Sequence, residues 1–138
     1  LHRVDRRQRQ MCIRDSTLLG HVDNTQVMAT QRDLKPSVFV NLSSSEGLPV
    51  SMMEVASLGI PIIATGVGGV GEIVSSDNGH LLPAEFTDAQ ASDALVQLAR
   101  LSEDEYQQVC QASRQVWEEK FRASVVYPEF CREVLGGR

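Results

Sequence analysis

The sequence predicts an α/β domain in which helices alternate with the strands of a layered, mostly parallel sheet, and the C-terminus is helical. Two short runs rich in β-branched residues, Val38–Leu42 and Ile62–Thr65, have the length and composition of buried strands. An apolar helical stretch, Val50–Leu58, lies between them. A strand, a helix and a second strand in this order favour parallel pairing across a crossover helix.

The segment ahead of the first buried strand is predicted to hold a short strand and a helix. Thr17–Val22 is the predicted strand. Asn24 is a residue type that favours the N-cap of a helix. That helix should end near Leu34, because the following Lys35-Pro36 step disfavours helical geometry.

The two buried strands are joined through a loop and the apolar helix. The loop, Ser43–Leu48, is rich in serine and glycine and lacks apolar periodicity. Pro49 suits the first turn of the helix, where its missing N–H would lack a partner in any case. Gly59 is expected to end the helix, and Pro61 leads into the second strand.

The glycine-rich stretch Gly66–Gly71 matches the pattern G-x-G-x-x-G and follows a strand, but it is not a dinucleotide-binding fingerprint. That fingerprint needs a helix that opens at the glycines, and here a turn arrives within a few residues. The glycines are instead expected to allow close approach of the backbone, a ligand being one candidate partner. Glu72 is predicted to start a helical turn or to accept a hydrogen bond. His80–Leu82 is predicted as a further strand.

The C-terminal third is predicted to be helical. Asp88 is expected to cap one helix, and Ser102 with Glu105 has the spacing of a capping box for the next. Phe121–Leu135 continues as a helix with a break at Tyr127-Pro128. The apolar faces expected in the core are Ala91, Ala94, Leu95, Leu98 and Ala99 in the first helix, and Tyr106, Val109, Cys110, Val116 and Trp117 in the second.

Composition narrows the classes of function. The chain has 138 residues, of which 42% are hydrophobic and 22% charged, as is typical of one globular domain with a core. Its net charge of −5 argues against nucleic acid as the main partner. No apolar run approaches the roughly 18 residues of a membrane span. Three scattered cysteines and three histidines form no metal-site or triad spacing, so the sequence predicts a cytoplasmic protein without a metal site.

Residues 1–16 differ from the rest of the chain. They hold Arg3, Arg6, Arg7, Arg9 and Arg14, five of the thirteen basic residues. The segment resembles a translated sequencing adaptor, and we expect it to be foreign to the fold or disordered. The predicted domain is therefore 17–138.

Two carboxylates flank the start of the apolar helix. Glu46 lies in the preceding loop and Glu54 in the second turn of the helix. A buried, unpaired carboxylate is costly, so Glu54 either pairs with an Arg or Lys, faces water, or accepts hydrogen bonds from ligand hydroxyls. Clefts that bind ligands form at the strand ends of open α/β sheets.

The helix start between the two carboxylates suits an anion. The amides of Leu48, Val50 and Ser51 lie near a helix N-terminus, which favours a phosphate. Glu54 is roughly 6–8 Å further along the axis, at about 1.5 Å per residue. An anion site between two hydroxyl acceptors would suit a nucleoside diphosphate sugar.

The stretch SSSEGLPVSMMEVASLGIPIIATGVGGVGE, residues 43–72, resembles the signature of retaining GT-B-fold glycosyltransferases of family 4. That family carries two glutamates separated by seven residues, as Glu46 and Glu54 are. Less specific similarity extends from about Leu18 to Phe130. The resemblance implies the C-terminal, Rossmann-like half of a GT-B fold, and its variant is similar to bacterial enzymes of cell-surface polysaccharide synthesis.

The resemblance also implies roles for individual residues. Glu46 would contact the donor sugar, with a catalytic role, and Glu54 the nucleotide ribose. His21 and Val22 would lie near the nucleobase, although a solvent-facing histidine is the preferred interpretation of His21. The remaining predicted donor contacts are Gly47, Leu48, Pro49, Val50 and Ser51.

The same resemblance implies the partners and the missing parts. The donor is a nucleotide sugar, no metal or other cofactor is needed, and a sugar or lipid-linked acceptor is held by an N-terminal domain that this chain lacks. The parent enzyme would work in the cytoplasm, with peripheral association at the inner face of the membrane as one option. This chain alone is expected to be inactive. The alternatives are a sugar-nucleotide epimerase of the same fold and a non-catalytic α/β module.

Overall fold

The computed structural model describes residues 16–136, and its centre is a three-stranded parallel sheet. Strands β1 (Phe39–Asn41), β2 (Ile62–Thr65) and β3 (Gly79–Leu82) lie in the order β1-β2-β3. Helix α3 (Val50–Ser57) joins β1 to β2, and a 3-10 helix η1 (Gly68–Glu72) lies between β2 and β3. Four further helices are α2 (Asn24–Leu34), α4 (Asp88–Ala99), α5 (Glu103–Lys120) and α6 (Ala123–Leu135).

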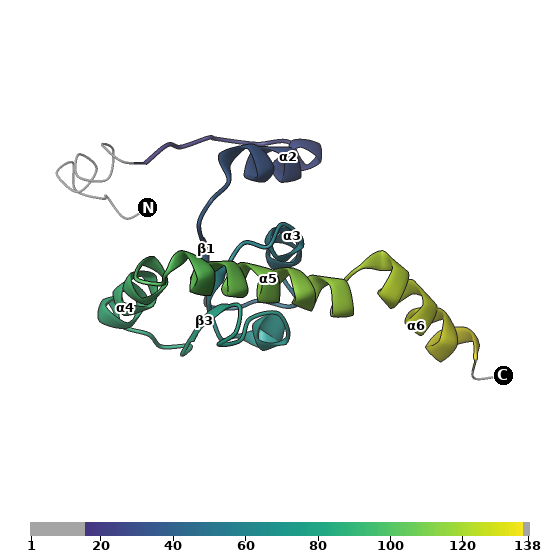
Figure 1. Cartoon of the computed structure of the whole chain (residues 1–138). Helices are drawn as coiled ribbons and strands as arrows, with labels where there is room; N and C mark the ends of the chain where they lie inside the picture. The colour runs from purple at the N-terminus through teal and green to yellow at the C-terminus, as the bar shows by residue number, and fades with distance from the viewer. Residues whose placement is uncertain (1–15, 137–138) are drawn as a thin grey trace.

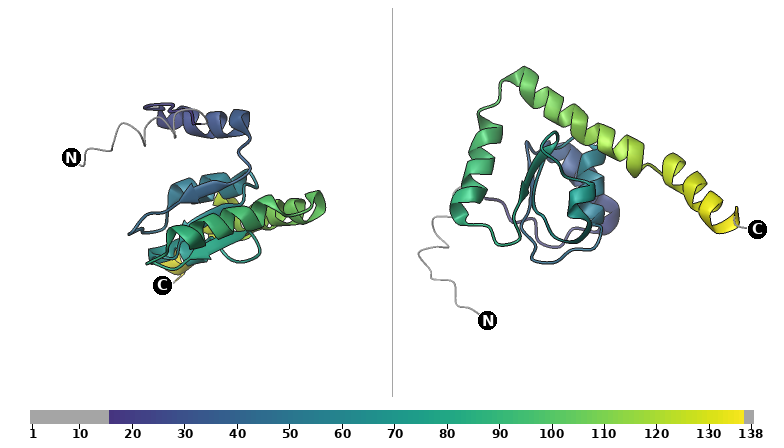
Figure 2. Two further views of the ribbon diagram at one scale, coloured as in Figure 1. Left: turned by 90° about the vertical axis from the view of Figure 1, so that its left-hand side faces the viewer. Right: turned by 90° about the horizontal axis from the view of Figure 1, so that it is seen from below.

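The alternation of side chains along β2 separates two layers of core. Ile62 and Ala64 pack in one cluster with α3, and Trp117 of α5 covers the edge of that cluster. Ile63 points to the opposite face and packs with Ala94 of α4. Figure 2 shows α3 and α4 on opposite sides of the sheet, with α5 crossing the end of both layers. Burial of each large aliphatic side chain contributes about 1.5–3 kcal/mol to the stability of the fold. The predicted α/β fold with a parallel sheet is confirmed.

The C-terminal end of α3 is fixed at several points. The N–H of Ile60 donates to Val55 at 3.1 Å and that of Gly59 to Ala56 at 2.9 Å, which is the Schellman pattern. Gly59 has a φ of +71°, as the predicted helix stop requires. From α5, Arg114 donates to the carbonyl of Ser57, so a cation also lies at the negative end of the helix.

The predicted N-terminal strand is absent. Residues 16–23 form a coil that passes over the side of α2 facing away from the sheet (Figure 1). Leu18 is 94% exposed there. Thr17–Val22 does not form a strand, because a strand needs a partner strand and this segment pairs with none of β1, β2 and β3. Helix α2 ends at Leu34 as predicted, but its N-cap is Asp23 rather than Asn24. The carboxylate of Asp23 accepts from the N–H of Thr25 at 2.9 Å.

Several predicted boundaries and faces also change. The first buried strand is shorter than Val38–Leu42, and both Val40 and Leu42 are exposed, since β1 is an edge strand of the sheet that residues 16–136 form. In α4, Leu95 and Ala99 are exposed instead of lying in the core. Only three predicted apolar side chains of α4 pack on the sheet, namely Ala91, Ala94 and Leu98.

The C-terminal helices begin and end differently from the prediction. Thr87, rather than Asp88, is the N-cap of α4 and forms a capping box with Gln90. The predicted capping box of α5 is confirmed. The break lies at Phe121–Arg122, and α6 runs through Pro128. Proline removes one helical hydrogen bond, and on this exposed helix, which extends away from the sheet in Figure 1, water can replace it.

Candidate functional site

The candidate site lies at the edge of the sheet where the parallel strands end. The loop after β1 carries Glu46, and the turn after β2 is η1. These two connections meet directly, since the N–H of Gly69 donates to the carbonyl of Gly47 at 2.8 Å. Such an edge is where open α/β sheets bind ligands.

Glu46 is held by the end of β1. The side-chain amide of Asn41 donates to Glu46 Oε1 at 3.0 Å. The opposite end of that amide, Asn41 Oδ1, accepts from the N–H of Ser43 at 3.0 Å and from its hydroxyl at 2.6 Å. These two bonds turn the amide nitrogen toward the carboxylate. Hydrogen bonding from Ser43, and then from Asn41, lowers the pKa of the Glu46 carboxyl, so Glu46 is ionised at neutral pH.

Glu54 is half-buried in the second turn of α3. Within residues 16–136 its carboxylate has no hydrogen bond and no ion pair, and the hydroxyl of Ser57 donates instead to its backbone carbonyl at 2.6 Å. The pairing with an Arg or Lys that would give Glu54 a purely structural role is therefore not found in this part of the chain. Its oxygens are open to water or to a ligand.

The start of α3 offers unused N–H groups between the two glutamates. Pro49 is the buried N-cap, and no side chain caps the helix. Met52 and Met53 donate to the carbonyl of Pro49 at 3.1 and 3.4 Å. The amides of Val50 and Ser51 have no partner in the described part of the chain. Free N–H groups and the helix dipole together favour an anion here.

Of the remaining predicted site residues, two lie in the loop beside α3 and two in the coil before α2. Gly47 and Leu48 are exposed in the loop beside α3. His21 is exposed and Val22 half-buried in the coil before α2, and no described contact links either residue to Glu46 or Glu54.

Two features were missed from the sequence. Asn41 orients Glu46, and an asparagine ending a strand before a serine is the signal that could have found it. Thr65 ends β2 with its hydroxyl buried and without a hydrogen-bond partner among residues 16–136. Glu72 was expected to start a turn or accept a hydrogen bond. It ends η1 instead of starting a turn, but its backbone carbonyl accepts a hydrogen bond from Lys120 Nζ at 3.1 Å, while its carboxylate makes none in the described part.

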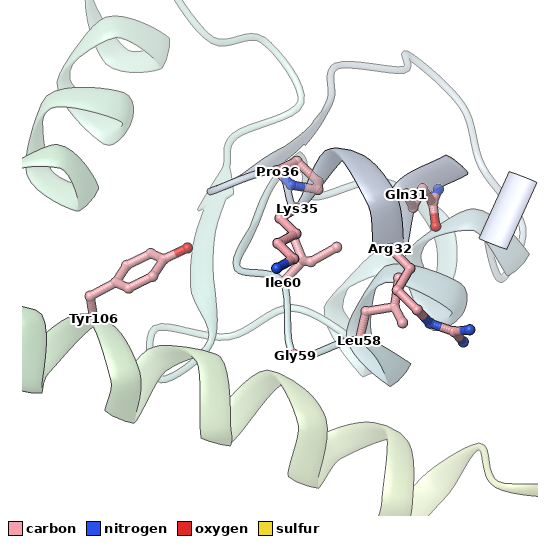
Figure 3. Close-up of a pocket in the computed structure, with 8 residues that line it drawn as sticks. All are labelled: Gln31, Arg32, Lys35, Pro36, Leu58, Gly59, Ile60 and Tyr106. Atoms are coloured by element: carbon pink, nitrogen blue, oxygen red, sulfur yellow. The ribbon is translucent and has the colours of Figure 1, made fainter. Parts of the chain in front are cut away.

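A cavity of about 330 Å³ lies at the opposite, amino end of the strands. It opens between α2, the end of α3 and α5 (Figure 3). The hydroxyl of Tyr106 at its edge donates to the carbonyl of Ser37 at 2.9 Å. None of the predicted site residues lines it; the lining consists of Gln31, Arg32, Lys35, Pro36, Leu58, Gly59, Ile60 and Tyr106.

Comparison with known proteins decides the family. The sequence model of the family described as glycosyl transferases group 1 matches residues 9–116. The chain belongs to this family. This membership confirms the expected resemblance to glycosyltransferases at the level of the group 1 family.

Two sequence relatives agree with the group 1 glycosyl transferase family. The chain is 35% identical over 100 residues to the colanic acid biosynthesis glycosyltransferase WcaL of Escherichia coli strain K12, covering 71% of this chain and 24% of that protein. It is 32% identical over 95 residues to WcaL of Salmonella typhimurium strain LT2, covering 67% of this chain and 23% of that protein. The chain thus spans about a quarter of the length of these relatives.

Two solved structures share the fold. Sucrose-phosphate synthase from Thermosynechococcus elongatus superposes with a TM-score of 0.73 at 18% identity, covering 95% of this chain and 33% of that one. The pneumococcal O-GlcNAc transferase GtfA, solved in complex with UDP and GlcNAc, gives a TM-score of 0.63 at 25% identity and coverages of 86% and 24%. The parallel sheet and its helices are similar to GT-B glycosyltransferase structures, as expected.

Membrane-spanning helices and metal-binding clusters are both missing from the described residues. Among the helices of residues 16–136, none combines the length and apolar character that crossing a bilayer requires. In the same part of the chain, no three His, Cys, Asp or Glu side chains are arranged to hold a metal ion.

Proposed function

We propose that this chain is the donor-binding part of a retaining, family 4 glycosyltransferase that moves a sugar from a nucleotide-sugar donor to an acceptor in polysaccharide or glycolipid synthesis. The observation that carries the proposal is the Glu46 carboxylate, held by Asn41 next to a helix start, that of α3, which no side chain caps. Membership of the group 1 family and the similarity to WcaL support the class of reaction and of product.

The start of α3 is proposed to bind the donor diphosphate. Glycosyl transfer breaks the bond between the sugar and the diphosphate, so negative charge builds on the leaving phosphate. The proposed donors to that charge are the N–H groups of Val50 and Ser51, which have no partner in the described part of the chain. An exposed helix terminus contributes only about 0.3–1 kcal/mol, so further positive charge must come from outside these residues.

The two glutamates are proposed to hold the two ends of the donor. Glu54 accepts hydrogen bonds from the ribose hydroxyls, since its carboxylate has no other partner among residues 16–136. Glu46 accepts from hydroxyls of the transferred sugar. Residues 17–138 form this donor half, and a separate domain holds the sugar or lipid-linked acceptor. Alone, the chain should release no nucleotide from nucleotide sugars above a buffer control, because nothing holds the acceptor against the donor.

The experiment compares two amide variants in the full-length parent enzyme. Glu54→Gln replaces a charged acceptor, and hydrogen bonds to charged groups are worth about 1.5–3 kcal/mol, so nucleotide affinity should fall roughly ten- to a hundredfold. Glu46→Gln should lower turnover more than nucleotide affinity, because its partner is the transferred sugar. Affinity is measured by calorimetry with UDP, GDP and ADP in turn, and turnover by initial rates.

A third variant controls for the loss of a carboxylate elsewhere. Glu129 is exposed on α6, far along the chain from the site, and Glu129→Gln should change neither quantity. Equal nucleotide affinity in the wild type and Glu54→Gln would refute the assignment of Glu54 to the ribose. Unchanged turnover in Glu46→Gln would refute the role of Glu46.

A further inference from the structure

The glycine turn after β2 is firmly attached to the sheet. The N–H of Gly66 donates to the carbonyl of Leu82 at 2.7 Å, which ties the start of the turn to β3. Val70, in the middle of η1, is completely buried in the core cluster beside α3. Moving this turn would break core packing, and protein interiors resist such shifts.

The same turn touches the backbone of the Glu46 loop. Gly68 has a φ of +55°, and a Cβ built on it would overlap the carbonyl oxygen of Glu46, far inside the 3.0 Å that real Cβ atoms keep. A Cβ on Gly69 would lie 2.9 Å from the carbonyl oxygen of Gly47. The close approach expected of these glycines is therefore present, and its partner is the chain itself.

We propose that Gly68 and Gly69 are positioning residues for Glu46. Because they carry no side chain, their backbone packs directly against the Glu46–Gly47 segment and fixes its position relative to the sheet. Asn41 holds the carboxylate of Glu46, the backbone of Gly68 packs on its carbonyl, and the N–H of Gly69 donates to the carbonyl of the next residue, Gly47, at 2.8 Å. Glu46 is thereby fixed at two points before a donor arrives. The catalytic consequence of this arrangement rests on the proposed role of Glu46 in donor binding.

Any side chain at Gly68 should displace the loop rather than the turn. The turn is anchored by Val70 in the core, whereas the loop is exposed at Gly47 and Leu48. Relieving the overlap moves the Glu46 carbonyl by on the order of 1 Å, and a misplacement of that size can lower a rate about 100-fold. The displacement also pulls the carboxylate away from Asn41 and Ser43.

The test uses Gly68→Ala with Gly71→Ala as the matched control. Gly71 lies in the same 3-10 helix, and a Cβ there would meet nothing closer than Leu81 at 3.9 Å. The first readout is the pKa of the Glu46 carboxyl in this chain, from an NMR titration of its side-chain carbon. It should rise toward the ordinary value for glutamate in Gly68→Ala and stay unchanged in Gly71→Ala, because the lowered pKa depends on the bonds to Ser43 and Asn41.

The second readout is activity of the parent enzyme. Gly68→Ala should lower kcat about 100-fold with a much smaller change in the KM for the donor. Thermal melts check that the variants are folded. If Gly68→Ala does not fold, Gly69→Ala decides in its place, since its clash with Gly47 is milder and its φ is not positive.

The two readouts separate the possible failures. A folded variant in which the pKa of Glu46 is unchanged overturns the positioning role of the turn. A shifted pKa with unchanged turnover supports the positioning of the loop and refutes the role of Glu46 in transfer. A shifted pKa with lowered kcat supports both.

Discussion

Replacement of Gly59 by alanine tests how the structure holds α3, the helix that carries Glu54. Gly59 follows the last turn of α3 with a φ of +71°, a conformation that costs about 1–2 kcal/mol for a residue with a Cβ. The new methyl group would lie 3.2 Å from the carbonyl oxygen of Cys110, so α5 must also yield by a few tenths of an ångström. The Gly59→Ala substitution also lowers the conformational entropy of the unfolded chain, which offsets about 0.4–1 kcal/mol of this cost. A net loss of about 1–2 kcal/mol is expected once the crowding is included.

Urea unfolding followed by fluorescence measures this loss. Trp117 is the single tryptophan of the chain and packs on the core cluster that α3 builds, so its emission reports the relevant contacts. With a slope of about 1–3 kcal/mol per molar urea, the midpoint should fall by roughly 0.3–2 M. Gly71→Ala is the control and should leave the midpoint unchanged or raise it slightly. An unchanged midpoint in Gly59→Ala would show that the end of α3 relaxes freely, and would refute the reasoning.

Three further outcomes are expected. The pKa of Glu105 is lowered by hydrogen bonds from the hydroxyl and the N–H of Ser102. This capping box therefore stabilises the fold fully at pH values above the ordinary glutamate pKa. The stabilisation is lost as the pH falls through the pKa that Glu105 has in the folded protein. Glu105→Gln should therefore lose less urea stability than the wild type between about pH 7 and about pH 3. Thr65→Val should raise the unfolding free energy by about 1 kcal/mol, since it removes a buried hydroxyl without a partner in the described part; a decrease would reveal a hidden partner. A chain that starts at Thr17 should melt as cooperatively as the full chain, and a broadened melt would show that residues 1–16 belong to the domain.

Local signals in the sequence determined most of the fold. The Ile62–Thr65 run, the glycine that ends α3 and the Ser102–Glu105 box each act over a few residues, and each appears where it was expected. The signature with Glu46 and Glu54 likewise predicted the glycosyltransferase family, because the whole signature lies in one continuous stretch of the chain. The structural signals depend on backbone geometry and capping, which neighbouring residues set.

Tertiary contacts decided what the local signals could not. Thr17–Val22 has the composition of a strand but remains a coil, because a strand also requires a partner. Ser113 is polar yet completely buried. Its hydroxyl donates to the carbonyl of Ile60, 53 positions earlier, at 2.8 Å, and this hydrogen bond compensates for the burial of the hydroxyl. Apolar periodicity cannot anticipate a buried hydroxyl of this kind.

The candidate site shows the same division. The sequence predicts a site at the two glutamates and the helix start between them, because those residues are close along the chain. It did not identify Asn41 as the residue that orients Glu46, or Gly68 as the residue that packs against its carbonyl. Gly68 and Glu46 meet because parallel strands bring successive loops to one edge of the sheet. The packing of the core beneath the two loops sets the distance between them. This packing forms only in the folded chain.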